Sequence, residues 1–560
     1  MKNTAALVIV GALLMCGSLC SGFSVPSEHE DVFRDDPSRM KVTTYVTKIS
    51  TETSFWMKSG QENLRRILSL QNNQNRAKNV IIFIGDGMGL STITSGRIFK
   101  GQQRGNSGEE YKLFFEKFPS TGFSKTYNVD RQVPDSAGTA TAMFSGVKAQ
   151  YRMLGLDAKA KYNTCDKNVN DNSQLTTIAT WAQESGMDTG FVTTTRVTHA
   201  TPGALYAHTN NRDWECDSNI PAQHRGCVKD IARQLVEDAP GNKFKVIMGG
   251  GAGVLGMSSS STDKEVCQRR DGRQLSEYWK EANPGGKLVT NVKELMSVDV
   301  ANTSKLMGIF SDDHLPYAAV KPDTVPTLAN MTLQAIRMLR KNKKGFFLMV
   351  EGGKIDLAHH QNHAQLALRE VAELDDAVTA AVANVNIDET LVIVTADHSH
   401  AFTMNGYPER GNDILGLTQS GSSQKYETLS YANGPGYFYH RLNDTNNVNH
   451  TWKDLENDEN RKDPFYRHFA ARYLKDETHG GEDVGVYAIG PYAHLFRSTF
   501  EQNYIAHVIA YAACFKDWPS HCDQAYNRYF YEVSQRLHNS AATTTPALVL
   551  MFLGLMAYLL

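Results

Sequence analysis

The chain has 560 residues, of which 41% are hydrophobic, and its formal net charge is −2. This composition is typical of a globular protein and excludes a chain that is disordered throughout. A net charge so close to zero also gives no reason to expect a nucleic-acid partner, although it leaves room for a local anion site.

The two ends of the chain resemble processing signals. Residues 1–22 combine Lys2, an apolar run and small residues, which predicts a secretory signal peptide; an N-terminal membrane anchor is the alternative. Residues 23–53 are a polar extension. At the other end, small residues around Asn539 and Ser540 precede an apolar tail that is shorter than the roughly 20 residues of a membrane-spanning helix. Residues 540–560 therefore predict a removed GPI-anchor signal, which would leave the protein on the extracellular face of the plasma membrane.

Secretion makes disulfide bonds and glycans expected features. Removal of the signal peptide leaves six cysteines, which allow 15 pairings: Cys165, Cys216, Cys227, Cys267, Cys514 and Cys522. Glycans are expected wherever the following sequons are exposed: Asn302, Asn330, Asn443 and Asn449.

Continuous apolar runs alternate with helical patterns along the middle of the chain. The runs include "KNVIIFIGDGMG", "TGFVTTTRVTHATP", "FKVIMGGG", "GFFLMVEGGKID", "TLVIVTADHSH" and "DVGVYAIGP". Helical patterns lie at 174–185, 328–340 and 364–385. This alternation predicts an α/β fold with a large, mostly parallel central sheet sandwiched by helices. The catalytic domain is expected over residues 54–530, with a surface insertion at about 405–475.

Polar residues follow the predicted strands, where open α/β sheets bind ligands. They are Asp86, His199, Thr201, Glu351, Asp356, Asp397 and His398. Carboxylates gathered at one edge repel one another unless cations neutralise them, so this pattern predicts metal ions. Asp356 and His360 are four residues apart and share a helix face, and His479 precedes another strand. Imidazole with carboxylate suits zinc, whereas the all-oxygen set of Asp86, Thr201 and Glu351 suits magnesium.

Simpler interpretations exist for each residue taken alone. A single aspartate at a strand end is an ordinary helix cap or turn residue, and Ser136 could be an N-cap. His359, His360 and His363 could form a solvated helix face. Two mixed ligand sets occurring together favour the metal site.

Seven motifs in chain order resemble the signatures of animal-type alkaline phosphatases: "GDGMG", "VPDSAGTATA", "TTTRVTHATP", "YAHTNNR", "VEGGKID", "VTADHSH" and "ETHGGEDV". The resemblance covers about residues 54–522. It implies a homodimer with a ten-stranded sheet, a surface crown, two zinc ions and one magnesium ion per subunit. Tyr407 matches a residue that reaches into the neighbouring subunit's site.

The resemblance also assigns roles to residues. The first zinc would be held by Asp356, His360 and His479, the second by Asp86, Asp397, His398 and Ser136, and magnesium by Asp86, Thr201 and Glu351. Arg212 would clamp two phosphate oxygens, and Asp135 and His199 would support the site from behind. Vertebrate members hold a fourth ion, calcium; Glu294 matches one of its ligands, but Ser311 and Val325 replace two others, which argues against that site here.

The resulting hypothesis is hydrolysis of phosphate monoesters with an alkaline optimum. Ser136, activated by zinc and by the N–H groups of a helix N-terminus, would attack phosphorus in line, and water would then hydrolyse the phosphoserine. Family disulfides would pair Cys165 with Cys227 and Cys514 with Cys522, and the additional Cys216 and Cys267 could pair. Alternatives are a phosphodiesterase or sulfatase with the same fold, and a surface receptor without turnover.

Overall fold

The computed structural model describes residues 53–257, 267–419, 424–442 and 451–515. The predicted signal peptide, the GPI-anchor signal, Cys522 and the sequons at Asn443 and Asn449 lie outside this part of the chain, as does the polar extension up to residue 52. None of the described helices is long and apolar enough to cross a bilayer.

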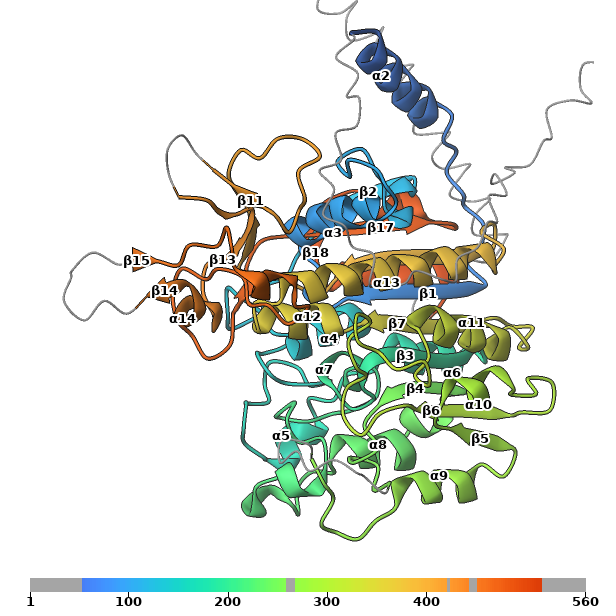
Figure 1. Ribbon diagram of the computed structural model, residues 1–560. Coiled ribbons are helices and arrows are strands. Elements are labelled where there is room, and N and C mark those ends of the chain that lie inside the picture. Colours follow the sequence, from blue (N-terminus) through green and yellow to red (C-terminus); the bar gives the residue numbers. More distant parts are fainter. Residues whose placement is uncertain (1–52, 258–266, 420–423, 443–450, 516–560) are drawn as a thin grey trace, which may run out of the picture. The chain divides into compact units, whose positions relative to one another are not determined.

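A ten-stranded sheet forms the centre of the described domain (Figure 1). Its strands, in spatial order, are β18 (Ser498–Glu501), β2 (Ser120–Lys125), β17 (Val484–Ile489), β8 (Thr390–Ala396), β1 (Asn79–Gly85), β7 (Phe346–Gly352), β3 (Asp188–Arg196), β4 (Val246–Gly250), β6 (Lys305–Ile309) and β5 (Gly286–Val289). All neighbours are parallel except β17, which is antiparallel to both β2 and β8. The predicted mostly parallel sheet is therefore confirmed.

The central strands are apolar along their whole length because both faces of the sheet are covered. In β1, Val80, Ile82 and Ile84 pack in one core, and the alternating Ile81 and Phe83 pack in the other. The first core includes residues of α4 (Ser136–Ser145), α6 (Ile178–Glu184), α8 (Ile231–Glu237), α9 (Leu275–Ala282) and α15 (Tyr504–Ala513). The second includes residues of α3 (Leu90–Gln103), α10 (Val292–Met296), α11 (Leu328–Leu339), α12 (Lys354–His360) and α13 (Ala364–Ala383) (Figure 1).

Smaller elements complete the domain. Four two-stranded antiparallel sheets pair β9 (Ser399–His400) with β16 (His479–Gly480), β10 (Phe402–Met404) with β13 (Leu429–Tyr431), β11 (Leu417–Thr418) with β12 (Tyr426–Glu427), and β14 (Arg441–Leu442) with β15 (Thr451–Trp452). The remaining α-helices among the described residues are α2 (Thr53–Leu68), α5 (Lys167–Asp171), α7 (Ala200–Gly203) and α14 (Gly436–His440).

Two disulfides lie wholly within the described residues. Cys165 is bonded to Cys227, as the family pattern predicted, and Cys216 is bonded to Cys267. Cys514 is also disulfide-bonded, while its predicted partner Cys522 lies outside the described part of the chain.

Candidate active site

The strand register brings three acidic residues to one edge of the sheet. Gly85 at the end of β1 is level with Gly352 of β7 and Ala396 of β8. Asp86 and Asp397 therefore follow neighbouring strands at the same level, and Glu351 lies one residue earlier on β7. All three side chains are completely buried. The prediction that these carboxylates gather at the strand ends is confirmed.

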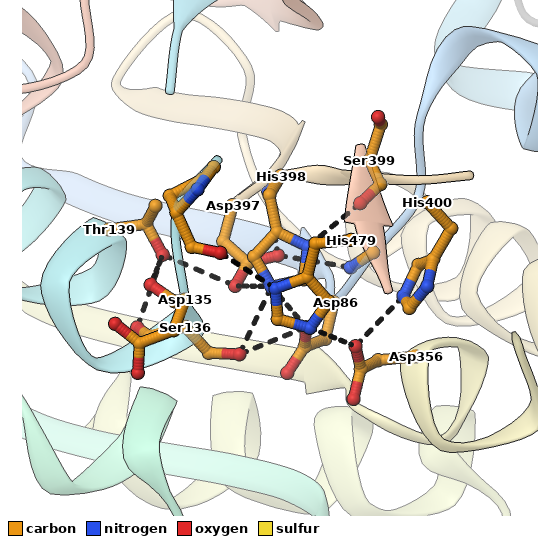
Figure 2. Close-up of polar contacts among 12 residues, drawn as sticks. Asp86, Asp135, Ser136, Thr139, Asp356, Asp397, His398, Ser399, His400 and His479 are labelled. Atoms are coloured by element: carbon orange, nitrogen blue, oxygen red, sulfur yellow. Dashed lines mark hydrogen bonds and ion pairs between the residues drawn. The ribbon is translucent and has the colours of Figure 1, made fainter. Parts of the chain in front are cut away.

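Ser136 is the first residue of α4, and its hydroxyl lies among the side chains at this edge (Figure 2). Its Oγ is 3.1 Å from His398 Nε2 and 3.5 Å from Asp86 Oδ1. Asp135, and not Ser136, is the N-cap of α4, so the interpretation of Ser136 as an ordinary cap is wrong. Because the Asp135 carboxylate accepts the N–H groups of Ala137 and Gly138, the helix directs these two groups at Asp135 and not at a substrate anion, contrary to expectation.

A second group of ligand atoms surrounds Asp356 Oδ1. His360 Nε2 lies 3.3 Å and His479 Nε2 3.2 Å from this oxygen, and the two nitrogens are 3.1 Å apart. Two ligands of a tetrahedral zinc lie about 3.3 Å from each other, given Zn–N and Zn–O distances of about 2.0–2.1 Å. His359 and His363 are buried, so these histidines do not form a solvated helix face.

The imidazole tautomers show that these atoms are free to bind a cation. Each Nδ1 lies beside a backbone carbonyl: that of His360 beside Glu477, that of His479 beside Pro134 and that of His398 beside Ser399. Because a carbonyl only accepts hydrogen bonds, each Nδ1 carries a proton, and in the neutral ring Nε2 then presents a lone pair. His398 Nε2 faces Asp397 Oδ2 at 3.2 Å and Asp86 Oδ1 at 3.5 Å. Lone pairs and carboxylates facing one another fit a bound metal ion.

The third group contains oxygen atoms only. Asp86 Oδ2, Thr201 Oγ1 and Glu351 Oε1 are buried and have no hydrogen-bond partner among the described residues. The other Glu351 oxygen accepts hydrogen bonds from the hydroxyls of Thr193 and Thr195. Burial raises the pKa of the Glu351 carboxyl to about 7, and burial followed by repulsion from Asp397 raises that of Asp86 well above its usual value. Buried oxygens without hydrogen-bond partners, on carboxyl groups whose ionisation burial opposes, fit a hard cation such as magnesium.

Arg212 lies beside this third group and is held from two sides. Its Nη1 donates to Asp135 Oδ2 at 3.1 Å, and its Nη2 contacts His199 Nε2 at 3.0 Å. Burial, followed by the nearby Arg212 charge, lowers the pKa of His199 well below its usual value, so the imidazole is neutral. Since Arg212 can only donate, His199 accepts through Nε2 and carries its proton on Nδ1. Because Nε2 is occupied by Arg212 and Nδ1 carries the proton, this arrangement fits the predicted supporting role of His199.

Sequence reasoning missed His400 and Glu477, which hold Asp356 in place. His400 Nε2 is 2.8 Å from Asp356 Oδ1 (Figure 2), and its Nδ1 is 2.6 Å from Glu477 Oε2. Although burial opposes protonation, the two carboxylates raise the pKa of His400 to about 10. His400 is thus a charged bridge between two carboxylates. The motifs "ADHSH" and "ETHGGEDV" contain both residues, but spacing alone did not distinguish them from ligands.

Comparison with known proteins identifies the family. The alkaline phosphatase family model matches residues 77–515. The chain belongs to the alkaline phosphatase family. It is 47% identical to alkaline phosphatase 4 of Drosophila melanogaster over 509 residues, which cover 85% of each chain. It is 41% identical to membrane-bound alkaline phosphatase of Bombyx mori over 479 residues, covering 83% of this chain and 86% of the relative.

The fold of the family is also seen in solved structures. The crystal structure of Thermus thermophilus alkaline phosphatase matches with a TM-score of 0.56 at 21% identity and covers 80% of this chain and 94% of that one. As a member of the alkaline phosphatase family, the protein is a phosphoric monoester hydrolase. The family implies metal ions. Ligand atoms of Asp86, Asp397 and His398 lie close enough together to hold one, and so do those of neighbouring sets that include Glu351, Asp356, His360 and His479 together with His199, His400 or Glu477.

Proposed function

We propose that the site holds two zinc ions and one magnesium ion. The first zinc would be bound by Asp356, His360 and His479; the second by Asp86, Ser136, Asp397 and His398; and magnesium by Asp86, Thr201 and Glu351. Converging lone pairs in the first two groups and unpartnered buried oxygens in the third support these assignments. Mixed nitrogen and oxygen ligands suit zinc, and oxygen ligands suit magnesium.

The protein would hydrolyse phosphate monoesters through a covalent phosphoserine on Ser136. When bound, these metal ions lower the pKa of hydroxyl groups in contact with them and neutralise the buried carboxylates. Ser136 Oγ gives up its proton to solvent and attacks phosphorus, the bond to the ester oxygen breaks, and that oxygen takes up a proton from solvent and leaves as the alcohol. Water then attacks the same phosphorus and loses a proton to solvent, the bond to Ser136 breaks, and Ser136 Oγ takes up a proton as phosphate is released. Because these steps need a deprotonated hydroxyl, the optimum is expected at alkaline pH.

Arg212 would bind the phosphoryl group and not the leaving alcohol. Each terminal nitrogen of its guanidinium group already makes one contact, to Asp135 or His199, and keeps a second N–H. Two parallel N–H groups match two phosphate oxygens, a geometry that a lysine cannot reproduce. Asp135 and His199 therefore orient the guanidinium plane in advance.

The observation that carries the phosphoserine proposal is the position of Ser136 Oγ between His398 Nε2 and Asp86 Oδ1. The test is Ser136→Ala, which is expected to lose at least about a thousandfold in kcat on p-nitrophenyl phosphate and to lose acid-stable phosphate labelling. Ser145→Ala is the control, because Ser145 is also a buried serine but lies at the other end of α4. Full activity of Ser136→Ala would contradict the nucleophile assignment.

Cellular location, glycosylation and assembly form a second part of the proposal. The C-terminal signal supports a GPI anchor on the extracellular face of the plasma membrane, and release by a phosphatidylinositol-specific phospholipase C tests it. Among the described sequons, Asn302 is exposed, whereas Asn330 is half-buried with its amide held by Thr327 and Met296, so Asn302 is the better acceptor. Tyr407 is 94% exposed, which supports a homodimer in which this residue is covered. No calcium site is included.

A further inference from the structure

A partly buried ion pair lies beside the residues of the active site. Arg196 ends β3, and its Nε and Nη2 donate to the two oxygens of Glu215 at 2.8 and 2.6 Å. Thr198 Oγ1 donates to the same carboxylate at 2.5 Å. A bidentate contact of this kind fixes the relative orientation of both side chains as well as their separation. Neither residue is a candidate metal ligand or touches the proposed phosphate site.

The pair closes a ring that contains Arg212. Residues 196–199 and residues 212–215 form two short segments of equal length, and they are joined at both ends. At one end Arg196 binds Glu215, and at the other end Arg212 Nη2 contacts His199 Nε2 at 3.0 Å. The backbone N–H of His199 also donates to the carbonyl of Arg196 at 3.0 Å, which keeps the first segment compact.

The 212–215 segment is also attached to other parts of the protein. Arg212 N–H donates to the Arg152 carbonyl, and the carbonyls of Trp214 and Glu215 accept from Ile231 and Ala232 at the start of α8. Asp213 forms an ion pair with Arg152, and the Trp214 side chain is buried. These hydrogen bonds and this ion pair are made to Arg152 and α8, whereas Glu215 connects the segment to Arg196 and Thr198, in the turn that leads to His199.

Arg196 also connects this ring to a third segment. Its Nη1 donates to Asp313 Oδ1 at 2.5 Å and contacts His314 Nε2 at 2.7 Å. The His314 ring in turn packs edge-on against His199, with 5.2 Å between ring centres. Arg196 thus holds three segments around the imidazole that orients Arg212.

We infer that Arg196 and Glu215 are positioning residues that set the place of the Arg212 guanidinium and thereby the affinity of the site for the phosphoryl group. The inference rests on the proposed contact of Arg212 with phosphate. Because a misplacement of about 1 Å costs up to about a hundredfold in a well-oriented site, loss of the pair is expected to weaken phosphate binding.

The test is Glu215→Gln in the full-length, metal-loaded enzyme. We expect KM for p-nitrophenyl phosphate and the inhibition constant of inorganic phosphate to rise about tenfold together, while kcat changes less than about threefold. Arg196→Lys keeps the charge but cannot form the bidentate contact, and it is expected to shift both constants in the same direction. This second variant also serves if Glu215→Gln does not fold.

Glu116→Gln is a matched control. Arg97 Nε and Nη2 donate to Glu116 at 2.7–3.0 Å, and this half-buried pair joins α3 to the short helix at 114–117, so its loss reports only a general effect on stability. If Glu215→Gln lowers Tm as Glu116→Gln does but leaves the phosphate inhibition constant unchanged, the inference is wrong.

A double-mutant cycle separates the inference from the function on which it rests. If Glu215 acts through Arg212, then Glu215→Gln has no further effect on the phosphate inhibition constant in an Arg212→Lys background. An equal effect in both backgrounds would refute the positioning role. Unchanged KM and inhibition constant in Arg212→Lys alone would instead refute the proposed phosphate contact.

Discussion

The second glycine of "GDGMG" is expected to be essential for holding Asp356. Gly87 has φ +71°, and a Cβ at this position would lie 2.3 Å from His400 Nε2. A left-handed backbone costs an L-residue about 1–2 kcal/mol. Relief of the overlap requires a shift of about 1 Å, since non-bonded carbon and nitrogen atoms normally stay about 3.5 Å apart. In Gly87→Ala, His400 must therefore move away from Asp356, to which it now binds at 2.8 Å.

The size of the effect follows from the role of His400. Loss of a residue that supports a metal ligand typically lowers metal affinity about 10–100-fold, which corresponds to about 1.4–2.7 kcal/mol. The assay is zinc content by elemental analysis after equilibration with a graded series of chelator concentrations, with activity restored by excess zinc. Gly87→Ala is expected to release zinc at about 10–100-fold lower chelator strength than the wild type.

Gly272→Ala isolates the backbone contribution. Gly272 has the same φ of +71°, but nothing lies within 4 Å of its added Cβ. This control is expected to lose some stability and to retain zinc like the wild type. If Gly87→Ala retains zinc as well as Gly272→Ala does, then His400 does not support the zinc site and the reasoning fails.

Three further predictions concern the buried carboxylates of the site, one disulfide and Glu427. Removal of metal ions by a chelator should lower Tm, because the carboxylates of Asp86, Glu351 and Asp397 then remain buried together without a cation. A free metal-ion concentration of 1,000 times Kd stabilises the folded protein by about 4 kcal/mol per site. An unchanged Tm in protein shown to be metal-free would contradict this. Replacing Cys216 and Cys267 by serine removes a disulfide with a sequence separation of 51. The free energy of unfolding, measured with denaturant, should fall by at most roughly 4 kcal/mol, since the Cys165–Cys227 disulfide already constrains the unfolded chain. An unchanged free energy of unfolding would show that the bond does not stabilise the fold. Burial raises the pKa of Glu427 to about 7 from 4.5, so the folded protein loses stability as pH rises between these values. The free energy of unfolding of Glu427→Gln, relative to that of the wild type, should therefore rise by up to about 3 kcal/mol between pH 5 and pH 8. Denaturant unfolding of both proteins at the two pH values measures this change. If the difference between the two proteins is the same at both pH values, the pKa of Glu427 is not raised.

The sequence predicted most of the strands that are buried on both faces. β1, β7 and β8 read as apolar runs because each of them lies between two layers of helices. It missed β2, in which buried and exposed residues alternate, and the short buried strand β6. It also missed the edge strands, β5 with one buried residue and β18 with none. The antiparallel direction of β17 was also missed, because an apolar run carries no information about strand direction.

The sequence predicted the residues that meet at the candidate site and two residues beside Arg212, Asp135 and His199, but it missed His400 and Glu477. Asp86, Asp397 and Glu351 follow or end recognisable strands, so their meeting is a consequence of register. His400 is indistinguishable from a ligand in the sequence, since only its two carboxylate partners, Asp356 and Glu477, make it a charged bridge. The Cys216–Cys267 pairing stayed open for a similar reason, because spacing does not select one pairing among several.

The position of β1 between β7 and β8 determines when the site can form during synthesis. Gly87 donates its N–H to Asp397, although the two residues are 310 positions apart in the chain. β1 therefore cannot pair with β7 and β8 until most of the polypeptide has left the ribosome. Pairings across such distances form slowly, and strands left unpaired meanwhile are prone to aggregate. We therefore expect folding during biosynthesis to need chaperones, because a single early strand is inserted between two late ones in the sheet.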